Sequence, residues 1–149
     1  VTHDQSEALA LSDRVAVMNR GVIEQIDTPE RLYREPSTPF VAAFVGGANV
    51  VEGNVEGRTF VAGETRFALP DGLAASNGPA TLVVRAEELA LDRSGTPLPL
   101  TARLFLGHAV EYRFALGDQL LRSVGLPMDA RPGARVGVRL RAGRLFKLV

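Results

Sequence analysis

The chain has 149 residues, of which 46% are apolar and 23% charged, and 17 basic residues balance 17 acidic ones. This composition is typical of a globular protein with one domain or two small ones, and zero net charge argues against electrostatic binding of nucleic acid or anionic membrane. The absence of cysteine excludes disulfides and cysteine nucleophiles, and with two histidines we expect no metal site. The first residue is Val rather than Met, so we expect a piece of a longer protein.

Helix and hairpin signals open the chain. Asp4 and Glu7 form an Asp-x-x-Glu pair ahead of an apolar run, which predicts a capping box and a helix that ends near Ser12. Residues 15–26 predict a hairpin, because apolar and other residues alternate before the Asn19-Arg20-Gly21 turn and the chain then returns as a second strand.

Two further short helices are predicted from a Thr-Pro pair that occurs twice. Thr28-Pro29 and Thr38-Pro39 are each an N-cap residue followed by proline at the first helical position. The first of these helices covers residues 30–34, and Gly46 ends the second as a C-cap. A change from helical to glycine-punctuated patterning follows, so we place a domain boundary between residues 1–48 and 49–149.

The second domain is predicted to be built from short strands separated by glycine turns, and Ser94–Pro97 is predicted to be a loop. The expected strands cover residues 50–55, 58–62, 66–69, 81–85, 98–106, 109–116, 120–124, 135–141 and 144–149. Several short strands at this spacing favour a small barrel or sandwich.

The chain lacks the motifs of a stand-alone enzyme. A phosphate-binding P-loop needs Gly-x-x-x-x-Gly-Lys-Ser/Thr, and the only lysine, Lys147, follows Phe146. No Asp-Glu pair follows an apolar strand, no Gly-x-Ser-x-Gly elbow exists, and no pair of histidines has zinc-binding spacing. We therefore expect this chain alone to be no enzyme and to bind no cofactor.

The first 49 residues, in contrast, carry a specific resemblance. They match, in one register without gaps, the region that begins at the switch histidine of ATP-binding-cassette (ABC) ATPases. The matching segments are Val1–Ala8, Asp13–Gln25, Thr28–Tyr33, Pro36, Phe40–Gly46 and Asn49. The chain resembles the C-terminal part of the nucleotide-binding domain of a bacterial importer ATPase that carries an extra C-terminal domain.

The second half is similar to that extra domain, an OB-like β module called TOBE. The similarity rests on Val84–Glu87, where the family usually shows Arg-Pro-Glu, and on Gly107 with Tyr112. Ala86 replaces the usual proline. The resemblance thus implies a mainly β fold, an OB-like barrel or sandwich, preceded by a short α/β remnant of the ABC domain.

The family resemblance also implies a role for His3. The matching histidine contacts the γ-phosphate of ATP and helps arrange the attacking water. The resemblance thus implies that His3 is a catalytic residue only in the intact parent, where ATP and Mg²⁺ bind at sites formed by residues outside this chain. In this chain alone we expect His3 to be a mobile residue near the terminus. Residues 1–26, separated from the rest of such an ATPase, would expose apolar faces and are expected to be disordered or to pair with another copy.

The same resemblance implies partners and a location. They are a second copy of the ATPase subunit and membrane permease subunits, with the parent at the inner face of the cell membrane in the cytoplasm. Residues 49–149 would serve regulation and dimerisation, and the resemblance permits a small ligand there. The chain looks closest to polyamine-type and iron(III)-type importers, so the predicted solute is a polyamine or iron(III), with sugar, sulfate and phosphate as the next candidates.

The alternative function is an independent OB-type nucleic-acid-binding module. Residues 131–149 hold five arginines, one lysine and no acid, but Phe146 is the only aromatic side chain available to stack on a base. Val136, Val138 and Leu140 alternate with other residues as in a half-buried strand, so no nucleic-acid partner is expected. His108 is predicted to be a surface histidine rather than a metal ligand.

Overall fold

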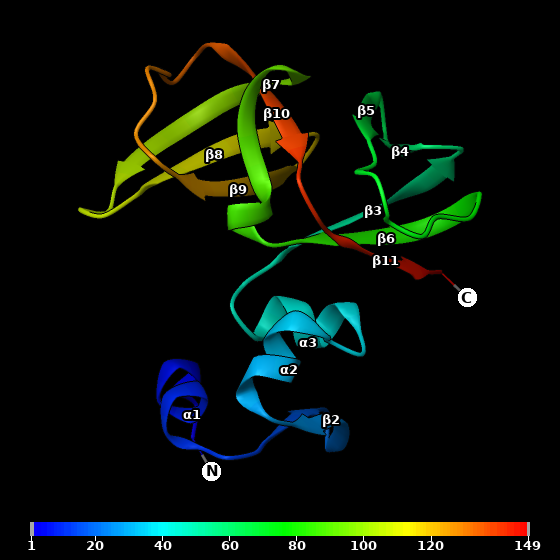
Figure 1. Ribbon diagram of the computed structural model, residues 1–149, viewed down its shortest axis with the longest axis vertical. Coiled ribbons are helices and arrows are strands. Elements are labelled where there is room, and N and C mark those ends of the chain that lie inside the picture. The colour runs from blue at the N-terminus through cyan, green and yellow to red at the C-terminus, as the bar shows by residue number, and fades with distance from the viewer. Residues whose placement is uncertain (1, 149) are drawn as a thin grey trace. The chain divides into compact units, whose positions relative to one another are not determined.

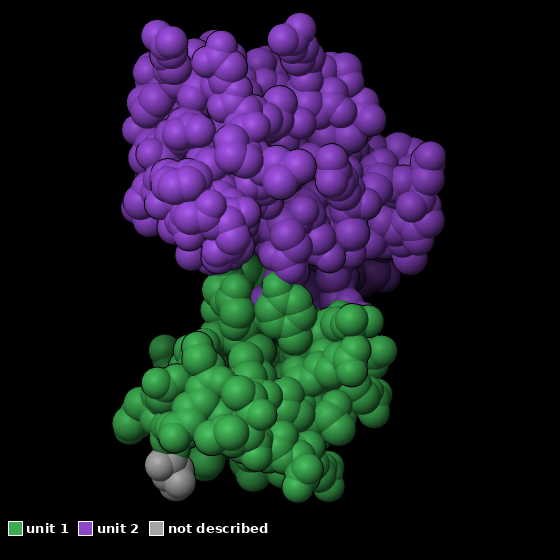
Figure 2. Space-filling model, turned by 60° about the vertical axis from the view of Figure 1, so that its left-hand side comes forward, with its two compact units in different colours: residues 1–48 green, residues 49–149 purple. Residues whose placement is uncertain are grey.

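The protein divides into two compact units, residues 1–48 and residues 49–149 (Figure 2). The structure, a computed structural model, describes residues 2–148. Unit 1 holds three helices and a hairpin (Figure 1): α1 (Gln5–Leu11), β1 (Val15–Asn19), β2 (Val22–Asp27), α2 (Pro29–Arg34) and α3 (Pro39–Phe44).

Side-chain caps start all three helices where the sequence predicts them. The hydroxyls of Thr28 and Thr38 accept from the third residue of their helices, at 3.4 and 3.2 Å, and the Asp4 carboxylate accepts from the Glu7 backbone at 3.0 Å. The expected second half of the capping box is absent, because the Asp4 backbone N–H donates to the Thr2 hydroxyl at 3.0 Å instead. The short threonine side chain loses less rotamer freedom in this bond than glutamate would.

Unit 1 has a small hydrophobic core of its own. Val17 of β1 packs with Leu32 of α2, and with Val41 and Val45 of the α3 segment, and all four are buried. The expected disorder of residues 1–26 is therefore wrong for residues 2–26, which form α1 and the β1–β2 hairpin against this core.

Unit 2 contains two antiparallel sheets (Figure 1). One has the strand order β10-β7-β8-β9 and the other the order β11-β6-β3-β4-β5. The strands are β3 (Asn49–Glu56), β4 (Thr59–Ala62), β5 (Thr65–Ala68), β6 (Gly78–Val84), β7 (Leu89–Phe105), β8 (Val110–Leu116), β9 (Gln119–Gly125), β10 (Arg135–Leu140) and β11 (Arg144–Lys147), with a 3₁₀ turn η1 (Ala86–Glu88).

The two sheets of unit 2 share one hydrophobic core. Phe60 and Leu82 from the five-stranded sheet, and Tyr112 and Phe114 from the other, are fully buried members of it. The predicted fold class, mainly β and OB-like, is confirmed. Within the described residues the sheets form a sandwich and do not close into one barrel.

One prediction fails in β7. Ser94–Pro97 was expected to be a loop but lies within this strand, whose first half, from Leu89, the sequence pattern does not indicate. Gly137 of β10 pairs with Pro97 and the next residue pairs with Leu91, so residues 92–96 bulge out of the ladder. The turn-forming residues of this segment therefore form a bulge inside a long strand. The strand continues through the bulge because β10 pairs with β7 on both sides of it.

Glycines make this bulge sterically feasible. A Cβ atom on Gly95 would lie 2.2 Å from the Val138 carbonyl oxygen, and one on Gly137 would lie 2.1 Å from the Asp92 carbonyl oxygen. Both contacts are with backbone, which cannot rotate away. The bulge therefore needs glycine on both strands.

Candidate functional site

His3 lies at the rim of a pocket of about 480 Å³ in unit 1, which we name the His3 pocket. Its apolar wall comes from α1, β1 and the end of α3, and its polar end from the residues that precede and begin α1. The lining residues are Thr2–Gln5, Ala8, Leu9, Ser12, Arg14–Met18, Phe44 and Val45. Because Asp4 caps α1, the backbone next to His3 is held at the helix start.

The His3 side chain is exposed, and within residues 2–148 its imidazole has no hydrogen-bond partner. Both ring nitrogens are thus available to an outside group, and an imidazole N–H is a good donor to a phosphate oxygen. The aromatic rings of Phe40 and Phe44, 5.8 Å apart and stacked, lie on α3, whose end forms the pocket wall.

The His3 pocket does not by itself fit a nucleoside triphosphate with its metal. Apart from His3, its only basic side chain is Arg14, and the rest of the wall is mostly apolar. Within the described residues, no group of three or more His, Cys, Asp or Glu side chains is placed to hold a metal ion. His3 and its pocket are at most one wall of such a site.

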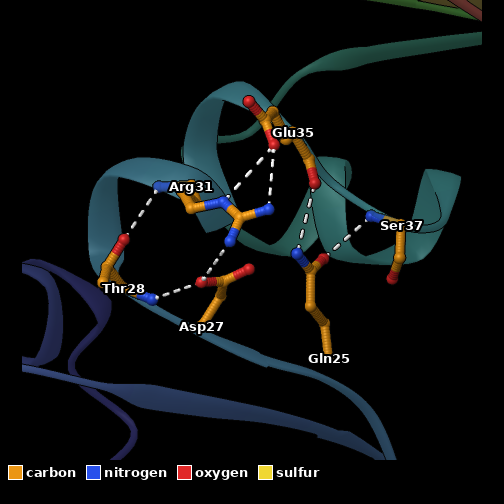
Figure 3. Close-up of polar contacts among 6 residues, drawn as sticks. All are labelled: Gln25, Asp27, Thr28, Arg31, Glu35 and Ser37. Carbon is orange, nitrogen blue, oxygen red and sulfur yellow. Dashed lines mark hydrogen bonds and ion pairs between the residues drawn. The ribbon is translucent and has the colours of Figure 1, made fainter.

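A polar network fastens the helices of unit 1 to the hairpin (Figure 3). The side-chain amide of Gln25 donates to the Glu35 carbonyl at 3.2 Å and accepts from the Ser37 backbone at 2.8 Å. Arg31 forms ion pairs with Asp27 at 3.6 Å and with Glu35 at 3.3 Å. The network fixes the chain between α2 and α3, and so the start of the helix whose end lines the His3 pocket.

Sequence reasoning missed Gln25, and no local signal marks it. Its neighbour Glu24 is similar, since its carboxylate accepts from the Asn19 amide at 3.1 Å and from the Thr38 hydroxyl at 3.3 Å. Both residues are polar positions on a hairpin, and their partners lie ten or more residues later or across the turn. Only the folded chain brings them together.

The remaining sequence candidates lie in unit 2. His108 is exposed beside the Gly107 turn between β7 and β8. In β10, Val138 and Leu140 are buried, whereas Arg139 is exposed, so the basic residues of this strand form the outer side of a half-buried strand.

Comparisons with known proteins extend over both units. The chain is 36% identical to the sulfate/thiosulfate import ATP-binding protein CysA of Ralstonia nicotianae over 164 aligned positions, which include 98% of this chain and 44% of that protein. The chain is homologous to importer ATP-binding subunits. The spermidine/putrescine import ATP-binding protein PotA of Pseudomonas fluorescens is also 36% identical, over 99% of this chain and 42% of its own length.

Other importer ATP-binding subunits match part of the chain more closely. CysA of Xanthomonas campestris is 50% identical over 98 residues, which are 65% of this chain and 28% of that protein. No family model matches the chain. The chain spans less than half the length of these curated relatives.

These matches confirm the resemblance to importer ATPases and favour it over the nucleic-acid-binding alternative. They leave the role of His3 a prediction, because they do not assign site residues. None of the described helices has the length and apolar character needed to cross a membrane.

Proposed function

We propose that this chain is the C-terminal part of the ATP-binding subunit of a bacterial ABC importer, a protein that couples ATP hydrolysis to solute uptake. The observation that carries the proposal is the 36% identity to two importer ATP-binding subunits over 98% and 99% of this chain. Unit 1 belongs to the nucleotide-binding domain in this proposal. Unit 2 is its OB-like TOBE domain, which serves regulation and association of two subunits.

His3 is the residue of this chain that we propose to contact nucleotide. Its exposed imidazole has no partner within residues 2–148 and lies where the Asp4 cap holds the backbone. In the complete subunit it donates a hydrogen bond to the terminal phosphate of ATP and so distinguishes ATP from ADP. The P-loop and the Mg²⁺ ligands come from residues outside this chain, which alone is no ATPase in this proposal.

The proposed partners are a second copy of the subunit and membrane permease subunits, which place the complete protein at the cytoplasmic face of the membrane. The sequence prediction for the solute was a polyamine or iron(III). The 50% identity to a sulfate/thiosulfate import protein favours sulfate or thiosulfate as the proposed solute. A polyamine is the second candidate, from the PotA match.

A chimera tests this proposal. Residues 1–149 replace the aligned segment of the Ralstonia CysA protein, and ATP hydrolysis and sulfate uptake are measured with its own permease. We expect both activities to persist, because the segment folds as two units that serve the same roles. A folded chimera that binds ATP but neither hydrolyses it nor supports uptake would show that the chain is not an importer subunit segment.

A further inference from the structure

Side-chain hydrogen bonds hold the chain on both sides of His3. The Asp4 backbone N–H donates to the Thr2 hydroxyl at 3.0 Å, and this bond closes a short turn whose middle residue is His3. Beyond it, the Asp4 carboxylate accepts from the Glu7 backbone N–H at 3.0 Å, and the Asp4 carbonyl accepts from the Ala8 N–H at 3.1 Å. Asp4 is thus held through its N–H, its carbonyl and its side chain.

Packing does not hold this segment. Thr2, His3 and Asp4 are all exposed, and α1 contains no buried residue. Within residues 2–148 the backbone of His3 forms no hydrogen bond. Because an exposed turn has many accessible backbone conformations, the order of His3 depends on the bonds that its two neighbours make.

Both neighbouring residue types suit this task. Threonine is β-branched and has few side-chain conformations, so its hydroxyl loses little freedom when it accepts from the backbone two residues later. Aspartate is among the best N-cap residues, because its short side chain places an oxygen beside the N–H of the third helical residue, here Glu7. One bond fixes the approach to His3 and the other fixes its exit.

The direction of the imidazole follows from this backbone. The ring lies at the end of a side chain, so a small rotation of the backbone at His3 moves its nitrogens by a larger distance. A donor that stabilises a phosphate in the transition state must lie about 2.7–3.1 Å from the oxygen. A displacement of about 1 Å can slow a reaction about 100-fold, so the order of His3 matters for the rate.

We propose that Thr2 and Asp4 are positioning residues for His3, and that their two side-chain bonds present its imidazole to the terminal phosphate of ATP in one orientation. This inference rests on the proposed function of His3 and extends it to two residues that do not themselves contact ATP. The Asp4 carboxylate acts as a hydrogen-bond acceptor for the helix and not through its charge.

Single-turnover ATP hydrolysis by the CysA chimera tests the role of Thr2. Thr2→Val keeps the shape of the side chain but removes the hydroxyl, so the rate should fall about tenfold or more while the Kd of ATP changes less than about twofold. Thr2→Ser keeps the hydroxyl and should retain most of the rate. Thr28→Val is the matched control, because it removes the hydroxyl that caps α2 in the same unit, and it should leave the rate unchanged.

Two substitutions of Asp4 separate capping from charge. Asp4→Ala removes the acceptor and should lower the rate about tenfold. Asp4→Asn removes the charge but caps a helix equally well, so its rate should stay within about threefold of the unsubstituted chimera. An Asp4→Asn chimera as slow as the Asp4→Ala chimera would show that the charge is required and would overturn the capping role.

A double substitution shows whether Thr2 acts through His3. In a His3→Ala chimera, Thr2→Val should change the rate less than about twofold, because no imidazole remains to be positioned. A further tenfold fall would overturn the proposal. If His3→Ala alone is slow but Thr2→Val and Asp4→Ala are not, only the positioning role is wrong. If His3→Ala is as fast as the unsubstituted chimera, the proposed function of His3 is wrong and the positioning role with it.

A measurement on the 149-residue chain itself needs no ATP hydrolysis. The nitrogen-15 heteronuclear NOE of the His3 amide reports motion of its backbone on the picosecond-to-nanosecond timescale. We expect this NOE to fall in Thr2→Val and in Asp4→Ala, and to keep the wild-type value in Asp4→Asn and in Thr28→Val. A His3 NOE that is the same in the wild-type, Thr2→Val and Asp4→Ala chains would overturn the proposal.

Discussion

The side-chain amide of Asn49 makes both hydrogen bonds that a neighbouring strand would make to Arg122. Its Nδ2 donates to the Arg122 carbonyl at 2.8 Å, and its Oδ1 accepts from the Arg122 backbone N–H at 2.7 Å. Arg122 lies in β9, the outer strand of its sheet, whereas Asn49 begins β3 of the other sheet. One buried amide thus satisfies a sheet edge and ties the two sheets together.

Asn49→Ala should therefore destabilise unit 2. The substitution leaves the Arg122 N–H and carbonyl without the amide, and the expected loss in the free energy of unfolding is about 2–3 kcal/mol. Urea denaturation followed by fluorescence or circular dichroism measures it. Asn54→Ala, in the same strand but without a side-chain hydrogen bond in the described residues, should change stability by less than about 0.5 kcal/mol. Equal effects of the two substitutions would contradict this role.

Gly137 should not tolerate a side chain, because its Cβ would lie 2.1 Å from the Asp92 carbonyl oxygen. We expect Gly137→Ala to lower the free energy of unfolding by about 2 kcal/mol or more. Gly125→Ala is the matched control in β9, since a Cβ there meets nothing within 4 Å. Thermal unfolding of both variants decides the matter, and a Gly137→Ala chain as stable as the Gly125→Ala chain would refute the close approach at the bulge.

The Asp92 carboxylate makes the stability of the fold depend on pH in the acid range. Hydrogen bonds from Ser94 first, and then the charges of Arg139 and Arg141, hold the pKa of its carboxyl below its usual value. A carboxyl whose pKa is lower in the folded state stabilises the fold above its unfolded pKa of about 3.9, and this contribution is lost as the pH falls through the folded pKa. Ser94→Ala should raise the pKa of Asp92 in a carbon-13 NMR titration.

The matching stability experiment uses Asp92→Asn. Below about pH 4 the wild-type chain should lose stability more steeply than this variant, because the variant has no carboxylate to protonate. Parallel pH profiles for the two chains would show that the Asp92 carboxyl does not link stability to pH. An Asp92 pKa unmoved by Ser94→Ala would show that Ser94 does not stabilise the charged carboxylate.

Gln25 should govern the order of the segment between α2 and α3. Gln25→Ala removes the acceptor for the Ser37 N–H and the donor to the Glu35 carbonyl, at a cost of about 1 kcal/mol in the stability of unit 1. Hydrogen exchange by NMR should show the Ser37 amide losing protection. Gln119→Ala at the exposed start of β9 serves as control, and unchanged Ser37 protection in the Gln25→Ala chain would argue against the role of this network.

Local chemistry explains which parts of the fold the sequence predicts. The Thr28-Pro29 and Thr38-Pro39 pairs act within three residues, so both helix starts are confirmed. Asp4 also caps as predicted, but the Thr2 hydroxyl took the bond expected of Glu7 because two acceptors competed for one nearby N–H.

Pairing between residues far apart in the sequence explains the features that sequence reasoning did not predict. Ser94–Pro97 has the composition of a loop, and only its pairing with β10 makes it part of a strand. Asn49 and Arg122 are far apart in sequence, so no local pattern indicates their contact. His3, by comparison, was predicted as a site residue from its match to a family motif rather than from spacing or burial.

The most direct measurement of the central claim is the rate of ATP hydrolysis in a single turnover by the CysA chimera that carries His3→Ala. We expect the rate to fall about 100-fold or more while ATP still binds, because one preorganised donor to the terminal phosphate is lost. His108→Ala, which changes an exposed histidine of unit 2, should hydrolyse ATP at the unsubstituted rate. A His3→Ala chimera that hydrolyses ATP as fast as the His108→Ala chimera would contradict the account.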